Sequence, residues 1–150
     1  MERLKIEDVL EKEGVYVATI CGISMYPMLR NQRDTVVIKP YTGRLKKYDV
    51  PLYKVGDRYI LHRIIKVLPD SYIIRGDNLQ EKEYGITDEK ILGVLTSFYR
   101  DEKEIKLDNW IYKTYVFIWH TFFYPRIFVQ KAYNKLKRGR IVNAGSDITS

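Results

Sequence analysis

The strongest constraint on the fold is a series of short apolar runs, rich in β-branched and aromatic residues, separated by glycine, proline and acidic residues. Each run suits one strand and is too short for a typical helix, and turn signals recur at roughly 8–12-residue intervals. Such spacing is typical of an antiparallel β-barrel or sandwich. The sequence therefore predicts a mainly β, antiparallel, barrel-like core with strands over residues 15–20, 34–39, 48–54, 59–68, 72–75, 91–99 and 104–107.

Turn and cap residues add local detail to this core. Residues 3–13 place leucine and valine among charged residues and stop at Gly14, which predicts a short amphipathic helix with a glycine cap. Pro51 cannot donate a ladder hydrogen bond, so its strand is expected at a sheet edge or a bulge. Residues 55–58 predict a hairpin turn, and residues 87–90 predict the start of a one-turn helix.

The chain changes character after Asp108. Residues 110–124 are apolar and aromatic, and residues 126–138 place Phe128, Ala132 and Leu136 on one helical stripe among lysines and arginines. Seven basic residues against Asp147 alone give this end +6 of the net charge of +7. A chain of 150 residues fits one compact domain with an appendage. We therefore predict a β domain over 1–108, a helical appendage over 109–140 and a flexible tail over 141–150.

The appendage is the expected point of contact with a membrane surface. A spanning helix needs about 20 mainly apolar residues, and the run over 110–124 is shorter and contains Lys113 and His120. Aromatic residues beside a basic helix are typical of an in-plane anchor, although a helical hairpin packed on the β domain or a partner is the alternative. Residues 1–8 lack an apolar signal region, so we expect no N-terminal anchor and a peripheral-membrane or cytoplasmic location.

Cysteine and histidine usage excludes several kinds of site. Cys21 is the only cysteine, so no internal disulfide is expected, and no cluster of short-spaced ligands predicts a metal or other cofactor. In a predicted strand, this thiol is expected to be a small buried residue. The two histidines are His62 and His120, and the second is expected to be packed or interfacial within the appendage.

The residues that indicate chemistry centre on Ser24, in the segment Cys21-Gly22-Ile23-Ser24-Met25-Tyr26-Pro27-Met28-Leu29. A serine hydroxyl becomes a nucleophile only beside a positioned base. His62, within the predicted strand 59–68, is the candidate base, and Asp77, after strand 72–75, is the candidate third member. Because proline suits the first turn of a helix, Pro27 predicts that Ser24 lies where a strand turns into a short helix.

Together these segments resemble the signal peptidase family. Gly22-Ile23-Ser24-Met25-Tyr26-Pro27-Met28-Leu29 is similar to its nucleophile box, Tyr59-Ile60-Leu61-His62-Arg63-Ile64 to its base box, and Ile73-Ile74-Arg75-Gly76-Asp77-Asn78 to its Gly-Asp-Asn box. A histidine rather than a lysine at the base position matches the endoplasmic-reticulum and archaeal branch. The resemblance covers roughly residues 15–99.

The resemblance implies a serine endopeptidase that removes leader peptides after small residues. Ser24 would attack the scissile carbonyl, His62 would carry the proton, and Asp77 would hold the imidazole. The Ser24 N–H is the expected oxyanion donor, and Gly22, Met25 and Pro27 belong to the expected oxyanion and substrate region, with the Met25 side chain expected to pack in the core. The family often places a second aspartate shortly after Asn78, a role for which Asp88 is the candidate.

The extended substrate would add as a strand beside residues 20–25 and near His62. The expected partner is thus a peptide or pre-protein that carries a leader sequence, and no nucleic acid is expected. The alternatives are a self-cleaving enzyme of the related repressor group, a cytoplasmic leader-processing peptidase, and a non-catalytic binding module of the same fold.

Overall fold

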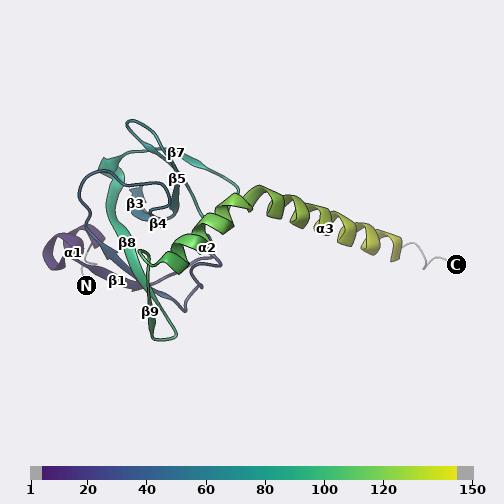
Figure 1. The fold of residues 1–150 in the computed structure, drawn as a ribbon, viewed down its shortest axis with the longest axis horizontal. Helices are drawn as coiled ribbons and strands as arrows, with labels where there is room; N and C mark the ends of the chain where they lie inside the picture. Colours follow the sequence, from purple (N-terminus) through teal and green to yellow (C-terminus); the bar gives the residue numbers. More distant parts are fainter. Residues whose placement is uncertain (1–4, 145–150) are drawn as a thin grey trace. The chain divides into compact units, whose positions relative to one another are not determined.

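The computed structural model describes residues 5–144, with side-chain exposure defined up to residue 138. The chain forms two compact units whose boundary lies between Tyr112 and Lys113, slightly after the predicted boundary at residue 108. The first unit is mainly antiparallel β, with a curled half-barrel sheet, and helices follow in the second (Figure 1). The coarse fold prediction is therefore confirmed.

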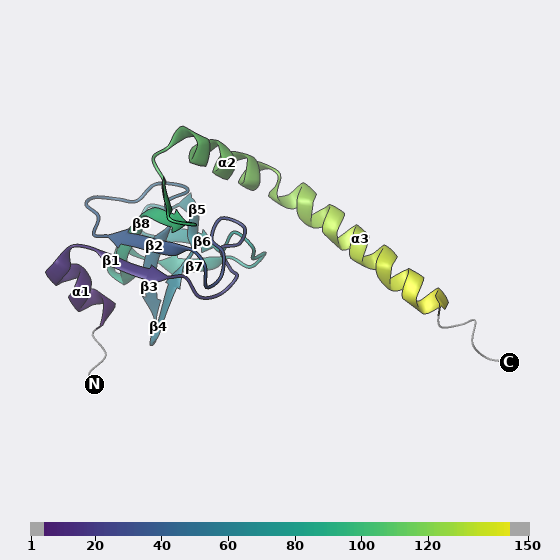
Figure 2. The ribbon, with the colours of Figure 1, turned by 90° about the horizontal axis from the view of Figure 1, so that it is seen from below.

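The larger sheet has six strands in the order β1-β2-β8-β3-β4, with β9 also paired to β8. Every pairing is antiparallel. Its elements and the preceding helix are α1 (Ile6–Glu13), β1 (Tyr16–Thr19), β2 (Thr35–Lys39), β3 (Pro51–Val55), β4 (Arg58–Leu61), β8 (Ile91–Arg100) and β9 (Lys103–Lys106). Figure 2 gives a second view of this sheet.

A separate sheet has three antiparallel strands in the order β5-β6-β7. Its strands are β5 (Arg63–Val67), β6 (Tyr72–Arg75) and β7 (Glu83–Ile86), and the 3-10 helix η1 (Asp88–Lys90) follows. The single strand predicted over 59–68 is thus two strands, β4 and β5, in different sheets, with His62 between them. β7 escaped prediction because its glycine and glutamate have low strand propensity, and pairing with β6 overrides that preference.

The cap and turn predictions are largely confirmed. Gly14 ends α1 with φ 68°, and its N–H donates to Leu10 O at 3.0 Å. The β3–β4 hairpin turns at Gly56, which has φ 59°. The prediction for Pro51 is half right, because β3 is an interior strand between β8 and β4 but its pairing with β8 has a bulge after Leu52. Pro51 is tolerated there because it is the first residue of the strand.

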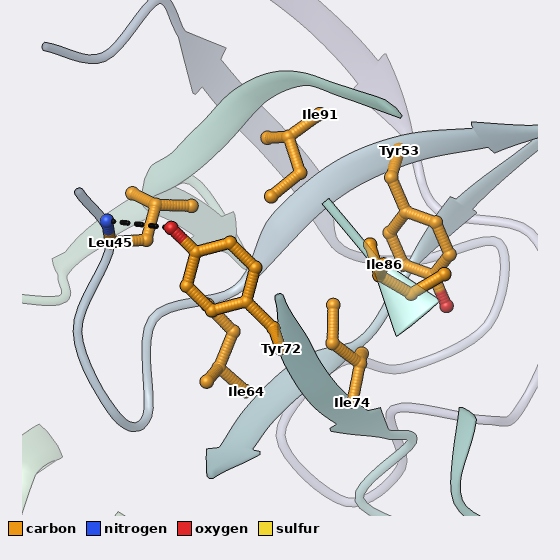
Figure 3. Close-up of a cluster of buried hydrophobic side chains, with 7 residues drawn as sticks. All are labelled: Leu45, Tyr53, Ile64, Tyr72, Ile74, Ile86 and Ile91. Carbon is orange, nitrogen blue, oxygen red and sulfur yellow. Dashed lines mark hydrogen bonds between the residues drawn. The ribbon is translucent and has the colours of Figure 1, made fainter. Parts of the chain in front are cut away.

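The hydrophobic core joins the two sheets of the first unit. Tyr53 and Ile91 come from the larger sheet, and most of the others come from the smaller one (Figure 3). The Tyr72 hydroxyl accepts a hydrogen bond from the Leu45 N–H at 3.2 Å, so its polar end is satisfied inside the cluster. Burial of each such side chain contributes about 1.5–3 kcal/mol. The cluster consists of Leu45, Tyr53, Ile64, Tyr72, Ile74, Ile86 and Ile91.

The second unit contains most of α2 (Trp110–Thr121) and all of α3 (Phe123–Ala144). Pro125 explains the break between them, because it cannot donate the helical hydrogen bond to Thr121. Hydrogen bonds from Phe122 N to Ile118 O and from Arg126 N to Phe122 O continue the helical pattern across the break, both at 3.0 Å. A connection this short does not reverse the chain, so the helical-hairpin alternative is wrong.

Two further predictions concern this end of the chain. Residues 141–144 of the predicted flexible tail belong to α3, and residues 145–150 lie outside the described residues. Within residues 5–144, no helix combines the length and the apolarity that crossing a membrane requires.

Candidate functional site

Ser24 lies in the loop that connects β1 to β2. The segment 24–28 forms turns, with hydrogen bonds from Tyr26 N to Ile23 O at 3.1 Å and from Leu29 N to Met25 O at 2.9 Å. The short helix predicted from Pro27 is therefore wrong. The helical pattern of the Leu29–Met25 hydrogen bond does not continue, because the next N–H, that of Arg30, donates to the Asp34 carboxylate at 2.9 Å.

Buried side chains and a glycine fix this loop. Met25, Met28 and Leu29 are each at most 3% exposed, so the predicted packing of Met25 is confirmed. Gly22 has φ 105°, a conformation that side chains rarely adopt, and its N–H donates to Asn31 Oδ1 at 2.8 Å. A Cβ on Gly22 would meet open space. Gly22 is therefore needed for its backbone conformation.

The backbone N–H of Ser24 remains the candidate oxyanion donor. Within residues 5–144 it donates no hydrogen bond to another protein group, and Ser24 itself is half-buried. Pro27 is also half-buried, and Tyr26 is 53% exposed. The loop around Ser24 is therefore partly exposed to solvent.

His62 occupies the point where the chain leaves the larger sheet for the smaller one, and it is 7% exposed. Its Nδ1 lies 2.7 Å from Glu83 Oε1 and 3.3 Å from the Tyr53 hydroxyl. A carboxylate only accepts hydrogen bonds, so we assign the proton of the neutral ring to Nδ1. This tautomer leaves the Nε2 lone pair as the proton acceptor, which is the state that a general base requires.

Tyr53 lies edge-on to the His62 ring, with centroids 6.3 Å apart. Burial raises the pKa of the Tyr53 hydroxyl well above its usual range, and the Glu83 carboxylate raises it further. Tyr53 is therefore a neutral hydroxyl at all physiological pH values. It provides a polar neighbour for the imidazole without adding a charge.

Asp77 is fully buried and pairs with Arg63. Arg63 Nε donates to Asp77 Oδ1 and Nη2 donates to Oδ2, both at 2.8 Å, in a two-pronged ion pair. Burial alone would lower the pKa of Arg63, but the Asp77 charge outweighs it and raises that pKa. The predicted contact of Asp77 with His62 is thus wrong, because Arg63 holds this carboxylate and Glu83 binds the imidazole.

Arg63 also reaches the loop that contains Ser24 and the start of α2. Its Nη1 donates to Tyr48 O at 3.0 Å and to the Tyr112 hydroxyl at 2.8 Å, and its Nη2 lies 2.7 Å from Met28 Sδ. The Tyr112 hydroxyl donates to the same sulfur at 3.1 Å. The buried guanidinium of Arg63, the residue after His62, therefore contacts the loop that contains Ser24.

The turn at residues 76–78 holds the Ser24 backbone directly. Asn78 N donates to Ser24 O at 2.8 Å, and Asn78 Nδ2 donates to Ile23 O at 3.2 Å. A Cβ on Gly76 would lie 2.7 Å from Ser24 O, so only glycine permits this approach. The predicted serine, histidine and aspartate segments are thus brought together by one framework of contacts.

The serine and the histidine are not hydrogen-bonded to each other. Among the described residues, Ser24 Oγ makes no hydrogen bond, and His62 bonds only through Nδ1. In enzymes without substrate, catalytic hydrogen bonds are often long and tighten on binding. The catalytic roles of both residues stay predictions.

Glu83 is the site residue that the sequence analysis missed. Its position six residues after Asp77 falls within the short interval where a second acidic residue was expected, but only an aspartate was considered. Asp88, the candidate for that role, instead accepts hydrogen bonds from the Tyr72 hydroxyl and from Arg44 Nη1. A search for either carboxylate in that interval would have found Glu81 and Glu83, and the structure shows that Glu83 is the one beside His62.

Other candidate residues have different outcomes. Cys21 is exposed, so its predicted burial is wrong: β1 ends at Thr19, which leaves Cys21 in the loop outside the sheet. His120 is half-buried within α2. Within the described part of the chain, no three His, Cys, Asp or Glu side chains gather in a way that would hold a metal ion.

Comparisons with known proteins supply no family for this chain: no family model matches it, and no curated protein does.

Proposed function

We propose that the protein is a serine endopeptidase of the signal-peptidase type, with Ser24 as nucleophile and His62 as general base. The observation that carries the proposal is the Glu83–His62 contact of 2.7 Å at Nδ1, which leaves Nε2 available to accept a proton. The anchoring of Ser24 O by Asn78 N supports it, because it places the serine loop on the framework built around Arg63.

The reaction follows the logic of a serine triad. Ser24 Oγ attacks the scissile carbonyl while His62 Nε2 takes the hydroxyl proton, and the Ser24 N–H donates to the developing oxyanion. His62 then passes the proton to the leaving amine, which departs and leaves an ester between Ser24 and the acyl half of the substrate. Water, deprotonated by the same nitrogen, hydrolyses the ester.

Glu83 takes the position that orients the base. Its carboxylate holds the Nδ1 proton and stabilises the imidazolium formed after proton transfer. Asp77 acts indirectly, as a positioning residue. Its carboxylate fixes the side chain of Arg63, which follows His62 in the chain. Both carboxylates are therefore needed, for different reasons.

The substrate we propose is an extended leader peptide with small residues before the cut. β1 and β4 stand at the two ends of the strand order β1-β2-β8-β3-β4, and β4 leads directly into His62. A peptide added beside either strand would gain main-chain hydrogen bonds. The family resemblance of the serine, histidine and Gly-Asp-Asn segments supplies the preference for small residues.

The test is cleavage of peptides with alanine or glycine before a candidate cut site, followed by mass spectrometry. We expect Ser24→Ala and His62→Ala to lose activity, and Glu83→Ala to lose about 10²–10⁴-fold because base orientation is lost. Ser71→Ala and His120→Ala are matched controls elsewhere in the chain and should retain activity. Full activity of Ser24→Ala would refute the proposal.

The same samples distinguish the self-cleaving alternative. A self-cleaving protein would fragment at a rate independent of its concentration and leave added peptides intact. A leader peptidase would cut added peptides and remain whole.

A further inference from the structure

An apolar arc lies along the exposed surface of α3. Phe128, Val129, Tyr133 and Leu136 are 65–75% exposed, and Ala132 is also exposed. At 100° per residue these five side chains span about 140° of the helix circumference. From residue 128 to residue 138, no charged residue falls within that arc. Over these residues the arc is continuous along more than two turns of the helix.

Basic residues border the arc on both edges. On the helical projection, Lys135 lies next to Phe128 at one edge and Lys137 lies next to Tyr133 at the other, and both side chains are exposed. Lys131 and Arg138 extend the positive charge onto the opposite face. The sequence from residue 109 to residue 146 contains no acidic residue at all.

We propose that this face of α3 binds an anionic lipid surface, with the helix lying in the plane of the headgroups. The apolar arc would enter the boundary between headgroups and acyl chains, while the lysine stems reach along it and place their ammonium groups among the phosphates. The apolar arc would contact the acyl chains, and the basic residues at its borders would contact the headgroup phosphates. The inference is independent of the proposed peptidase activity.

Charge argues against the two other occupants of such a face. A second copy of the chain would bring the same lysines against Lys135 and Lys137, and like charges repel. Nucleic acid would satisfy the lysines but leave Phe128 and Leu136 in water. An anionic bilayer is the partner that complements the charge and buries the apolar residues.

The experiment is flotation of the full-length protein with vesicles of equal parts phosphatidylcholine and phosphatidylglycerol, compared with pure phosphatidylcholine. We expect recovery with the anionic vesicles, and weaker recovery as salt is raised. The double variant Phe128→Ala/Leu136→Ala should bind roughly tenfold or more weakly, because two buried apolar side chains are truncated. Lys135→Gln/Lys137→Gln should lose roughly fivefold per charge.

The matched control is Gln130→Ala/Asn134→Ala, which makes the same kind of double substitution on the opposite face of the helix. Alanine preserves helix propensity, so α3 should stay helical in each variant. Equal binding of the arc variant and the control would overturn the proposal, as would equal recovery with neutral and anionic vesicles. So would a concentration-dependent dimer that the arc variant abolishes, because a second copy would then cover the face. Ser24→Ala should float like the wild type, which separates this inference from the enzymatic one.

Discussion

The sharpest test of the buried framework is Tyr112→Phe. The substitution removes one hydroxyl and keeps the ring, which lies 5.8 Å from the Arg63 guanidinium carbon. Arg63 Nη1 keeps its hydrogen bond to Tyr48 O but loses the 2.8 Å bond to the hydroxyl. Because Arg63 is fully buried, water does not replace the lost acceptor.

A hydrogen bond to a charged group contributes about 1.5–3 kcal/mol, and a buried donor left without an acceptor costs a similar amount. We therefore expect the free energy of unfolding to fall by about 1.5–3 kcal/mol, which corresponds to about 3–12 °C in Tm. The measurement is urea unfolding of the full chain, followed by near-ultraviolet circular dichroism. The slope against urea should not change, because the same surface is exposed on unfolding.

The matched control is Tyr84→Phe, which makes the same substitution at a side chain that is 67% exposed. It should stay within about 0.5 kcal/mol of the wild type. A Tyr112→Phe protein as stable as this control would refute the account of Arg63 as a buried cation that depends on its full set of acceptors.

Three further predictions test other parts of the structure. Glu83→Gln keeps a group beside Nδ1 but removes the charge that stabilises the imidazolium, so kcat should fall about 10²-fold or more while folding is retained; unchanged kcat would exclude Glu83 from the site. Gly76→Ala places a Cβ 2.7 Å from Ser24 O, so the nucleophile loop must shift, and thermal unfolding should show a loss of about 1–3 kcal/mol together with reduced peptide cleavage. The hydrogen bond from Lys54 lowers the pKa of Glu7 to about 2, so its stabilising effect is complete above about pH 5 and is lost as the pH falls toward 2. Glu7→Gln should therefore be less stable than the wild type near neutral pH and similar to it in strong acid, and a gap that widens in acid would contradict this sign.

The sequence was informative where local physics decides the structure. Gly14, the turn at Gly56 and the short β-branched runs each specify their conformation through their own propensities, and the structure agrees at each. The serine, histidine and aspartate segments also proved to be neighbours, as their motifs suggested. The caps, turns and short strands need no knowledge of distant contacts, whereas the proximity of the three segments was expected only from the family resemblance.

The failures come from contacts between distant residues. No local pattern reveals that the Asp77 carboxylate pairs with Arg63 rather than with His62. This pairing depends on the approach of β5 to the end of β6. Similarly, the break at His62 follows from the division of the strands between two sheets. Arg63 could have been suspected, since a charged residue within an apolar strand requires a partner.

The segment between Asn78 and Glu83 resembles a loop that would tolerate insertions, because Asn78 and residues 80–82 are all exposed. Its two ends, however, make different contacts. Asn78 is hydrogen-bonded to the loop that contains Ser24, and Glu83 is hydrogen-bonded to the His62 imidazole. Because β7 begins at Glu83 and pairs with β6 there, an inserted residue would have to be accommodated between two fixed ends without displacing either of them. Among relatives of this protein, the length of this segment should therefore vary less than its residues do, which makes spacing rather than identity the feature by which to recognise them.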